Sequence, residues 1–319
     1  MERVLCGVDL GGTKLSVGLV SESGTLLAEE TVHDHVGLRP DDIVATIGRL
    51  VRGLLGSRGL TETSLIGIGV GTAGHVRRSD GSIIAMSNLP GFKGYPFRER
   101  LQSSFSAPVA IDNDANAQAY GEFRYGAGKA YSDFVFMTVS TQIGAGIVLG
   151  GKLYRGMTGT AGELGHTLVD PEGEDICPCG NRGCLIAKAS GVALRSTFRR
   201  QLAAGKSSRF VDLATLESAA IDGPLVARGL AAGDEACEAV MREFGRWIGI
   251  GVYNAFQTFN PKAVILGGGL MNWGEPFMEV IKATFKRLAG DMIFDEMPIL
   301  RASLEASGVI GAAALLLEE

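Results

Sequence analysis

A cluster of cysteines is the sequence feature that most constrains how this chain can fold. Three of its five cysteines, Cys177, Cys179 and Cys184, lie within eight residues, and His166 lies upstream of them. Three thiolates and one imidazole form the tetrahedral ligand set that zinc prefers, and a closed site of four protein ligands is structural. Disulfides or free thiols are the alternative, but an odd cysteine count and no apparent signal peptide favour metal. We therefore expect these four residues to bind a structural Zn²⁺.

The same stretch also predicts one wall of a binding site. Glu163 lies three residues before His166, so the metal loop places a carboxylate beside an imidazole. Gly180 and Gly183 allow the tight turns by which a short loop wraps around an ion. We expect the side chains of Glu163 and His166 to line the site.

Length and composition narrow the class of protein. A chain of 319 residues is long for one core, which predicts two domains. Its 46 glycines cluster in short motifs, which indicates backbone approach to ligands. The apolar runs are too short to span a membrane, and a net charge of −5 gives no basic surface for nucleic acid. We expect a cytoplasmic protein that binds neither nucleic acid nor membranes.

The first glycine motif lies between two predicted strands, Val4 to Leu10 and Leu15 to Val20. Gly11 and Gly12 let backbone N–H groups approach phosphate oxygens, and the hydroxyl of Thr13 adds a donor. Asp9, at the end of the first strand, is placed to hold Mg²⁺ through water. A plain hairpin turn would use the same glycines, so the motif alone leaves both interpretations open.

The second half of the chain repeats this pattern. A predicted strand, Phe134 to Val139, leads into a turn of hydroxyl side chains and glycines, Ser140 to Gly146, and then into another strand. Two such units predict a duplicated fold that closes on a nucleotide from both sides. A third group, Gly267 to Gly269, follows the predicted strand Ala263 to Leu266 and would let adenine or ribose lie on bare backbone.

Carboxylates also follow a predicted strand in the first half. The strand Val109 to Ile111 leads through Asp112 and Asn113 to Asp114 at the start of a helix. A carboxylate at this position can accept a proton from a hydroxyl nucleophile. Capping of the helix is the alternative role for either aspartate.

Taken together, these motifs resemble those of the ROK family (repressors, open reading frames and kinases), in particular its bacterial glucokinase-like sugar kinases. The cysteine motif with the preceding Glu-x-Gly-His is highly specific, whereas the glycine turns are not. The resemblance covers essentially the whole chain, in the blocks Asp9–Lys14, Ile111–Ala117, Glu163–His166, Cys177–Cys184, Leu266–Gly269 and Ser307–Leu315.

The resemblance implies an α/β chain with the hexokinase/actin-like ATPase fold, in which two α/β domains with mixed five-stranded sheets are hinged around a cleft. We expect a small α/β domain at residues 1–118 and a large one, carrying the zinc loop, at residues 119–305. A C-terminal helix at residues 306–319 is expected to pack back on the small domain.

The resemblance also assigns roles to individual residues. Asp114 would be the general base that deprotonates the sugar hydroxyl, and His166 would give one ring nitrogen to zinc and the other to the sugar. The implied sugar-binding residues are Gly74, Asn88, Asn113, Glu163 and His166. The implied ATP-binding residues are Asp9, Gly11, Gly12, Thr13, Lys14, Thr141, Gly144, Gly267, Gly268 and Gly269. The implied cofactors are ATP, Mg²⁺ and structural Zn²⁺, and the implied assembly is a homodimer or homotetramer.

Two positions depart from the family pattern. Ile186 stands where relatives usually have a glutamate that accepts hydrogen bonds from the C1–C2 edge of the sugar. Gln142 ends a turn, Ser140 to Gln142, that is usually Gly-Thr-Gly. We expect an ATP-dependent kinase acting on the 6-hydroxyl of glucose. The alternatives are a kinase for another hexose, an N-acetylhexosamine or a polyol, and a non-catalytic sugar-binding regulator.

The repressor branch of the family is the other class to weigh. Its members carry a helix-turn-helix ahead of the first glycine turn, and here eight residues precede Asp9. We therefore expect no DNA-binding domain and favour the kinase.

Overall fold

The computed structural model describes residues 3–86, 89, 91–217, 220–290 and 297–318. The chain divides into two compact units, the first formed by Met1–Phe136, Gly146–Gly162 and Ala302–Glu319 and the second by Met137–Ala145 and Glu163–Arg301. Residues 119–136 and 146–162 thus group with the first unit, although we expected them in the second domain. The domain boundaries drawn from the sequence stay a prediction.

The first unit contains a mixed five-stranded sheet of order β3-β2-β1-β4-β7. Its strands are β1 (Val4–Leu10), β2 (Leu15–Val20), β3 (Leu26–Val32), β4 (Leu65–Thr72) and β7 (Val109–Asn113). The first three are joined by short turns and pair antiparallel, whereas β4 and β7 add in parallel beside β1. Parallel neighbours bring the carboxyl ends of β1, β4 and β7 to one edge of the sheet.

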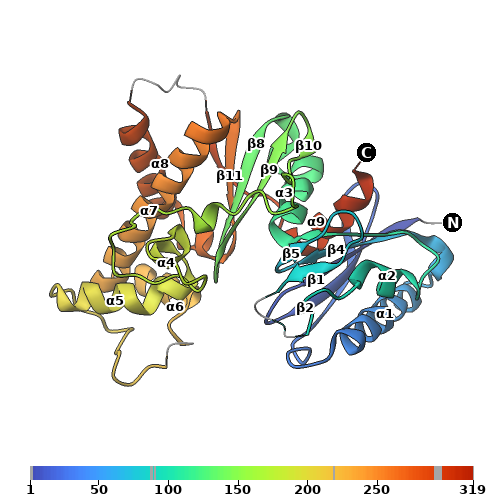
Figure 1. Ribbon diagram of the computed structural model, residues 1–319. Helices are drawn as coiled ribbons and strands as arrows, with labels where there is room; N and C mark the ends of the chain where they lie inside the picture. The colour runs from blue at the N-terminus through green and yellow to red at the C-terminus, as the bar shows by residue number, and fades with distance from the viewer. Residues whose placement is uncertain (1–2, 87–88, 90, 218–219, 291–296, 319) are drawn as a thin grey trace. The chain divides into compact units, whose positions relative to one another are not determined.

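Helices cover both faces of this sheet (Figure 1). Side chains of β1 alternate between the faces, so that Val4, Cys6 and Val8 pack with α1 (Pro40–Ser57), while Leu5 packs with α9 (Ser307–Ala314). Pro40 opens α1 in its first turn, where a missing N–H costs nothing.

The remaining elements of the first unit connect these layers. They are β5 (His75–Val76), β6 (Ile83–Ala85), α2 (Phe97–Gln102), α3 (Asp114–Tyr125), η1 (Glu62–Ser64), η2 (Ala127–Ala130) and η8 (Leu315–Leu317). Both α3 and β4 lie against α9.

A second five-stranded sheet has the order β10-β9-β8-β11-β12. Its strands are β8 (Phe134–Val139), β9 (Ile143–Leu149), β10 (Lys152–Leu153), β11 (Ala263–Gly267) and β12 (Ile299–Arg301). Antiparallel pairing of β9 with β10 and parallel pairing of β11 with β12 make it a mixed sheet as well. Two mixed five-stranded sheets confirm the expected fold class.

The second unit is rich in helices that pack against one long helix, α7 (Glu235–Phe259). Its other helices are α4 (Leu185–Ala189), α5 (Leu194–Ala203), α6 (Gly223–Ala231), α8 (Glu275–Ala289), η3 (Leu164–His166), η4 (Gly191–Ala193) and η6 (Gly269–Trp273). The side chain of Asp234 caps α7 by accepting from the N–H of Cys237. Among the described residues, no helix combines the length and apolar character needed to cross a membrane.

Two paired glycines let α9 rest directly on the backbone of the first sheet. Gly7 of β1 lies opposite Gly69 of β4. A Cβ on Gly7 would lie 1.9 Å from the carbonyl oxygen of Val309, and one on Gly69 would lie 1.8 Å from that of Ala312. Backbone atoms cannot rotate away as a side chain can, so any larger residue would push the helix off the sheet.

We predict that Gly69→Ala lowers the free energy of unfolding by about 3 kcal/mol, because the added methyl overpacks the contact with α9. Gly53→Ala is the matched control, since Gly53 is exposed on α1 with nothing within 4 Å of an added Cβ. That change should stabilise the protein by about 0.5–1 kcal/mol through helix propensity. Urea denaturation followed by circular dichroism measures both, and equal stabilities for the two variants would contradict the prediction.

Candidate functional site

The carboxyl ends of three parallel strands form the candidate site in the first unit. Asp9 of β1 pairs in register with Gly71 of β4, and Gly71 pairs with Asp112 of β7. The residues that follow these positions therefore emerge along one edge of the sheet. They are the turn from Gly11 to Lys14, the segment of Gly74 and the start of α3.

Asp9 is a partly buried carboxylate at the end of β1. Burial raises its pKa, and the ammonium of Lys14, 3.4 Å from its Oδ2 atom, opposes the rise. The first turn of α9 approaches so closely that a Cβ on Gly308 would lie 2.3 Å from the same oxygen. A glycine is therefore needed for α9 to begin beside Asp9, and the helix N-terminus favours a negative charge there.

Two histidines hold the glycine turn itself. The Nε2 atom of the fully buried His35 lies 2.9 Å from the carbonyl oxygen of Gly11, and Nδ1 of His33 lies 3.1 Å from that of Thr13. Neither histidine shows a ligand spacing in the sequence, so no contact of either one with the turn was expected. Their contacts fix backbone whose N–H groups are the proposed phosphate donors.

Asn113 and Asp114 begin helix α3. Asn113 caps the helix, since its Oδ1 accepts from the N–H of Ala115 at 2.9 Å, and its Nδ2 donates to the carbonyl oxygen of Gly74 at 3.0 Å. Asn113 is therefore the N-cap, and Asp114 occupies the first position of the helix, where its Oδ1 accepts from the same N–H at 2.8 Å. Gly74 has a φ of 119°, a conformation that favours glycine.

Asp112 orients this helix start and was not among the predicted site residues. Its buried carboxylate accepts from Nε of Arg155 at 2.5 Å, from the N–H of Asn113 at 2.7 Å and from Nδ2 of Asn116 at 2.9 Å. The guanidinium of Arg155 also makes two hydrogen bonds to the carboxylate of Glu318. Only the carboxylate at the strand end could have been noticed in the sequence, because Arg155 lies 43 positions away.

Glycine turns of the second unit also come together. Gly268, at a φ of 90°, lies so close to the end of β8 that a Cβ would be 2.4 Å from the carbonyl oxygen of Val139. This contact places the group Gly267 to Gly269 beside the turn that contains Thr141 and Gly144. The N–H of Gly191 donates to the carbonyl oxygen of Ser140 at 2.8 Å and fixes the turn from the other side.

His166, Cys177, Cys179 and Cys184 converge, with one potential ligand atom from each lying within 4.8 Å of the others. Nδ1 of His166 lies 3.5 Å from Sγ of Cys177, and Sγ of Cys179 lies 3.7 Å from Sγ of Cys184. Sulfur atoms bound tetrahedrally to Zn²⁺ at about 2.3 Å would be roughly 3.8 Å apart, so the donor set fits zinc. Burial raises the pKa of the Cys184 thiol to about 12, and a cation is needed to hold such a buried group as thiolate.

The metal loop, residues 166–184, is shaped by its glycines. Gly180 and Gly183 have φ values of 91° and 66°. A Cβ on Gly183 would lie 1.7 Å from the carbonyl oxygen of Asp170, where the two ends of the loop cross. The tight turns expected at both glycines are thus required by the path of the backbone.

His166 presents its two nitrogens to different partners. Nδ1 faces the thiol of Cys177, while Nε2 lies 3.9 Å from the carboxylate of Glu163. A metal on Nδ1 would fix the tautomer and leave Nε2 as a donor. Glu163 and His166 belong to the second unit and Gly74 and Asn113 to the first. Asn88 lies outside the described residues.

Comparison with solved structures defines the class of protein. A ROK hexokinase from Thermus thermophilus matches with a TM-score of 0.80 and 31% identity over 98% of this chain and 97% of the other. A ROK family glucokinase from Streptomyces griseus, in complex with glucose and AMPPNP, matches with a TM-score of 0.82 and 32% identity over 98% of both chains. The chain has the actin-like ATPase fold of these hexokinases.

Comparison of sequences gives the family. The ROK family model matches residues 5–319. A glucokinase of Streptomyces coelicolor is 33% identical over 98% of this chain and 97% of its own length, and a xylose repressor of Caldicellulosiruptor bescii is 29% identical over 99% and 78%. The chain belongs to the ROK family, whose members here include both kinases and repressors.

We predict about one zinc per chain, as a single closed site requires. Cys177→Ser removes one thiolate and should release the metal, whereas Cys237→Ser changes a buried cysteine outside the cluster and should retain it. Elemental analysis of the purified variants measures the content. Zinc-free wild-type protein, or equal zinc in the two variants, would show that the cluster is not the metal site.

Proposed function

We propose that this protein is an ATP-dependent sugar kinase that transfers the γ-phosphoryl group of ATP to a hexose hydroxyl. Glucose, phosphorylated on its 6-hydroxyl, is the first candidate. The observation that carries the proposal is the position of Asp114 at the start of α3, on the same sheet edge as Asp9 and Gly74. A base for the hydroxyl and a turn for the phosphates then share one edge of a sheet.

In the proposed reaction, Asp114 accepts the proton of the sugar hydroxyl as its oxygen attacks the γ-phosphorus. The new O–P bond forms while the bond to the leaving ADP oxygen breaks, and positioning with charge neutralisation carries most of the catalysis. Bound Mg²⁺ would neutralise the phosphate charge, and Asp9 is the carboxylate proposed to hold it through water. Backbone N–H groups at Gly11 to Lys14 and at Thr141 to Gly144 would bind the phosphates.

Candidate sugar-binding residues occur in each unit. Asn113 is held by its hydrogen bond to the carbonyl oxygen of Gly74, and His166 keeps Nε2 directed away from the thiols. Together with Asn88 and Glu163, these residues supply donors and acceptors suited to sugar hydroxyls. The proposed zinc would act only by holding the metal loop and orienting His166.

Ile186 supports a second candidate, a kinase for a sugar altered at its C1–C2 edge. Its side chain is 1% exposed and lies against Gly165, where a Cβ would come within 2.8 Å of its Cγ1 atom. Gly165 lies between Glu163 and His166 in the sequence, so an apolar side chain adjoins the proposed sugar-binding pair. The hydroxyls of glucose at this edge would find no carboxylate to accept their hydrogen bonds. Another hexose, an N-acetylhexosamine or a polyol that lacks or replaces those hydroxyls would fit the apolar side chain better.

A coupled assay of ADP release across hexoses, N-acetylhexosamines and polyols tests the proposal. A kinase releases ADP only when an accepted sugar is present. The family's repressors make a non-catalytic regulator the competing function, and such a protein would bind sugar in calorimetry without releasing ADP with any of them.

We predict that Asp114→Asn lowers kcat at least about 10²–10⁴-fold, because the amide keeps the shape of the side chain but cannot accept the proton. Nucleotide affinity should stay near that of wild type. Asp42→Asn, at a half-exposed position on α1 outside the candidate site, is the matched control and should keep full turnover. Steady-state kinetics with nucleotide titration measures both, and a variant with wild-type turnover would leave Asp114 as a structural residue only.

We predict that Ile186→Glu raises kcat/KM for glucose about tenfold to a hundredfold, because a carboxylate would accept hydrogen bonds that isoleucine cannot. Ile186→Leu keeps the side chain apolar and should give no gain. Thermal unfolding checks that the buried glutamate is tolerated. A wild type that already strongly prefers glucose, with no gain in the glutamate variant, would remove Ile186 as a specificity determinant.

A further inference from the structure

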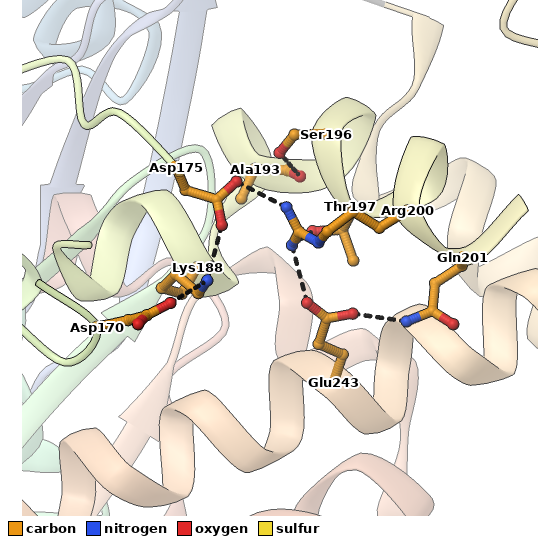
Figure 2. A network of polar contacts seen from close by, with 9 residues as sticks. All are labelled: Asp170, Asp175, Lys188, Ala193, Ser196, Thr197, Arg200, Gln201 and Glu243. Atoms are coloured by element: carbon orange, nitrogen blue, oxygen red, sulfur yellow. Dashed lines mark hydrogen bonds and ion pairs between the residues drawn. The ribbon is translucent and has the colours of Figure 1, made fainter. Parts of the chain in front are cut away.

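Lys188 is a buried lysine that joins two points of the metal loop. It lies on α4, the helix that follows Cys184, and only 7% of its side chain is exposed. Its ammonium donates to Oδ2 of Asp170 at 2.8 Å and to Oδ2 of Asp175 at 2.7 Å (Figure 2). Both carboxylates belong to the segment between the proposed ligands His166 and Cys177.

Asp175 extends these contacts to two more helices. Its second oxygen accepts from Nη1 of Arg200 on α5 at 2.7 Å, and Nη2 of Arg200 donates to Glu243 on α7 at 2.8 Å (Figure 2). Glu243 also accepts from Nε2 of Gln201 at 2.6 Å. The carboxylate of Asp175 therefore connects the middle of the metal loop to α4 and α5 directly, and to α7 through Arg200.

The ammonium of Lys188 is fully engaged. Besides the two carboxylates, it lies 4.7 Å from the centre of the Trp247 ring, within the range of a cation–π contact. Burial disfavours its charge, but hydrogen bonds to Asp170 and Asp175 outweigh burial and raise its pKa. A charged lysine with donors directed at both carboxylates acts as a fixed bridge across the loop.

Such a bridge reduces the cost of closing the metal site. The chain between His166 and Cys177 must be ordered when both bind one ion, and that loss of freedom weakens the binding. Contacts that hold Asp170 and Asp175 in place without metal remove part of this loss. Groups beyond the ligands typically change metal affinity by about 10–100-fold.

We propose that Lys188 is a positioning residue that holds the metal loop in its metal-binding conformation through Asp170 and Asp175. Through the loop it also orients Glu163 and His166 toward the sugar, and this second part rests on the proposed kinase function. Its partners support the assignment, because both carboxylates lie on the loop and neither lies on the core helices.

The test measures zinc affinity in the full-length protein by competition with a chromophoric chelator. Lys188→Met keeps the apolar stem and removes the charge, and it should weaken zinc binding about 10–100-fold. Lys206→Met, which removes a lysine from an exposed pair with Glu235, is the matched control and should bind zinc like wild type. Wild-type zinc affinity in Lys188→Met, or equal weakening in both variants, would overturn the proposal.

Two aspartate variants keep the proposal testable if Lys188→Met fails to fold. The carboxylate of Asp175, 11% exposed, forms ion pairs with both Lys188 and Arg200, whereas the carboxylate of Asp170, 32% exposed, forms one with Lys188. Asp175→Asn should therefore weaken zinc binding more than Asp170→Asn, and the reverse order or wild-type affinity in both would contradict the bridge.

Kinetics then examine the second part separately. Lys188→Met should raise KM for the sugar and leave KM for ATP unchanged, because the metal loop contains the proposed sugar-binding residue His166 and none of the proposed ATP-binding residues. Unchanged sugar KM with weakened zinc binding would remove this part alone. Because the zinc measurement needs no turnover, absence of kinase activity would count against the proposed function and not against the bridge.

Discussion

The buried carboxylate of Asp112 is the group on which the first unit's candidate site depends. It satisfies the guanidinium of Arg155 and at the same time accepts from the backbone and side chain of α3's first turn. Removing one partner of a buried ion pair typically costs about 3–5 kcal/mol, because the other charge is left without compensation. The start of α3, and with it Asp114, therefore cannot shift without breaking contacts to Arg155, which is itself held by Glu318.

The second unit uses the same physical device. There the buried charge is the ammonium of Lys188, and it holds a loop instead of a helix. Both sites combine glycines, which let backbone approach closely, with buried ion pairs, which give that backbone one orientation. The two features occur together because glycine allows many backbone conformations and does not by itself favour the one that the site needs. Specific charged partners supply the selection.

Membership of the ROK family leaves the choice of substrate to a few side chains. Kinases and repressors of this family share its fold with this chain, so function has to be argued from the site. In the resemblance drawn from the sequence, Ile186 and Gln142 are the positions expected to differ from the usual family motifs. Ile186 is buried beside the backbone between Glu163 and His166. The proposed preference for one sugar over another therefore depends on this one apolar side chain.

The sequence by itself determined the local elements and the chemistry of the metal loop. Strands β1, β2 and β8 begin and end where apolar runs and the adjoining turns predict, and the spacing of the cysteines identified a cluster that the structure brings together. Tertiary structure alone decided which charges are buried together and how the segments group into units. Arg155 lies 43 positions from Asp112 and 163 from Glu318, and Gly69 needs its missing Cβ only because α9 packs on it. Periodicity reports on neighbours within a few residues, whereas these contacts form only when distant segments fold against each other.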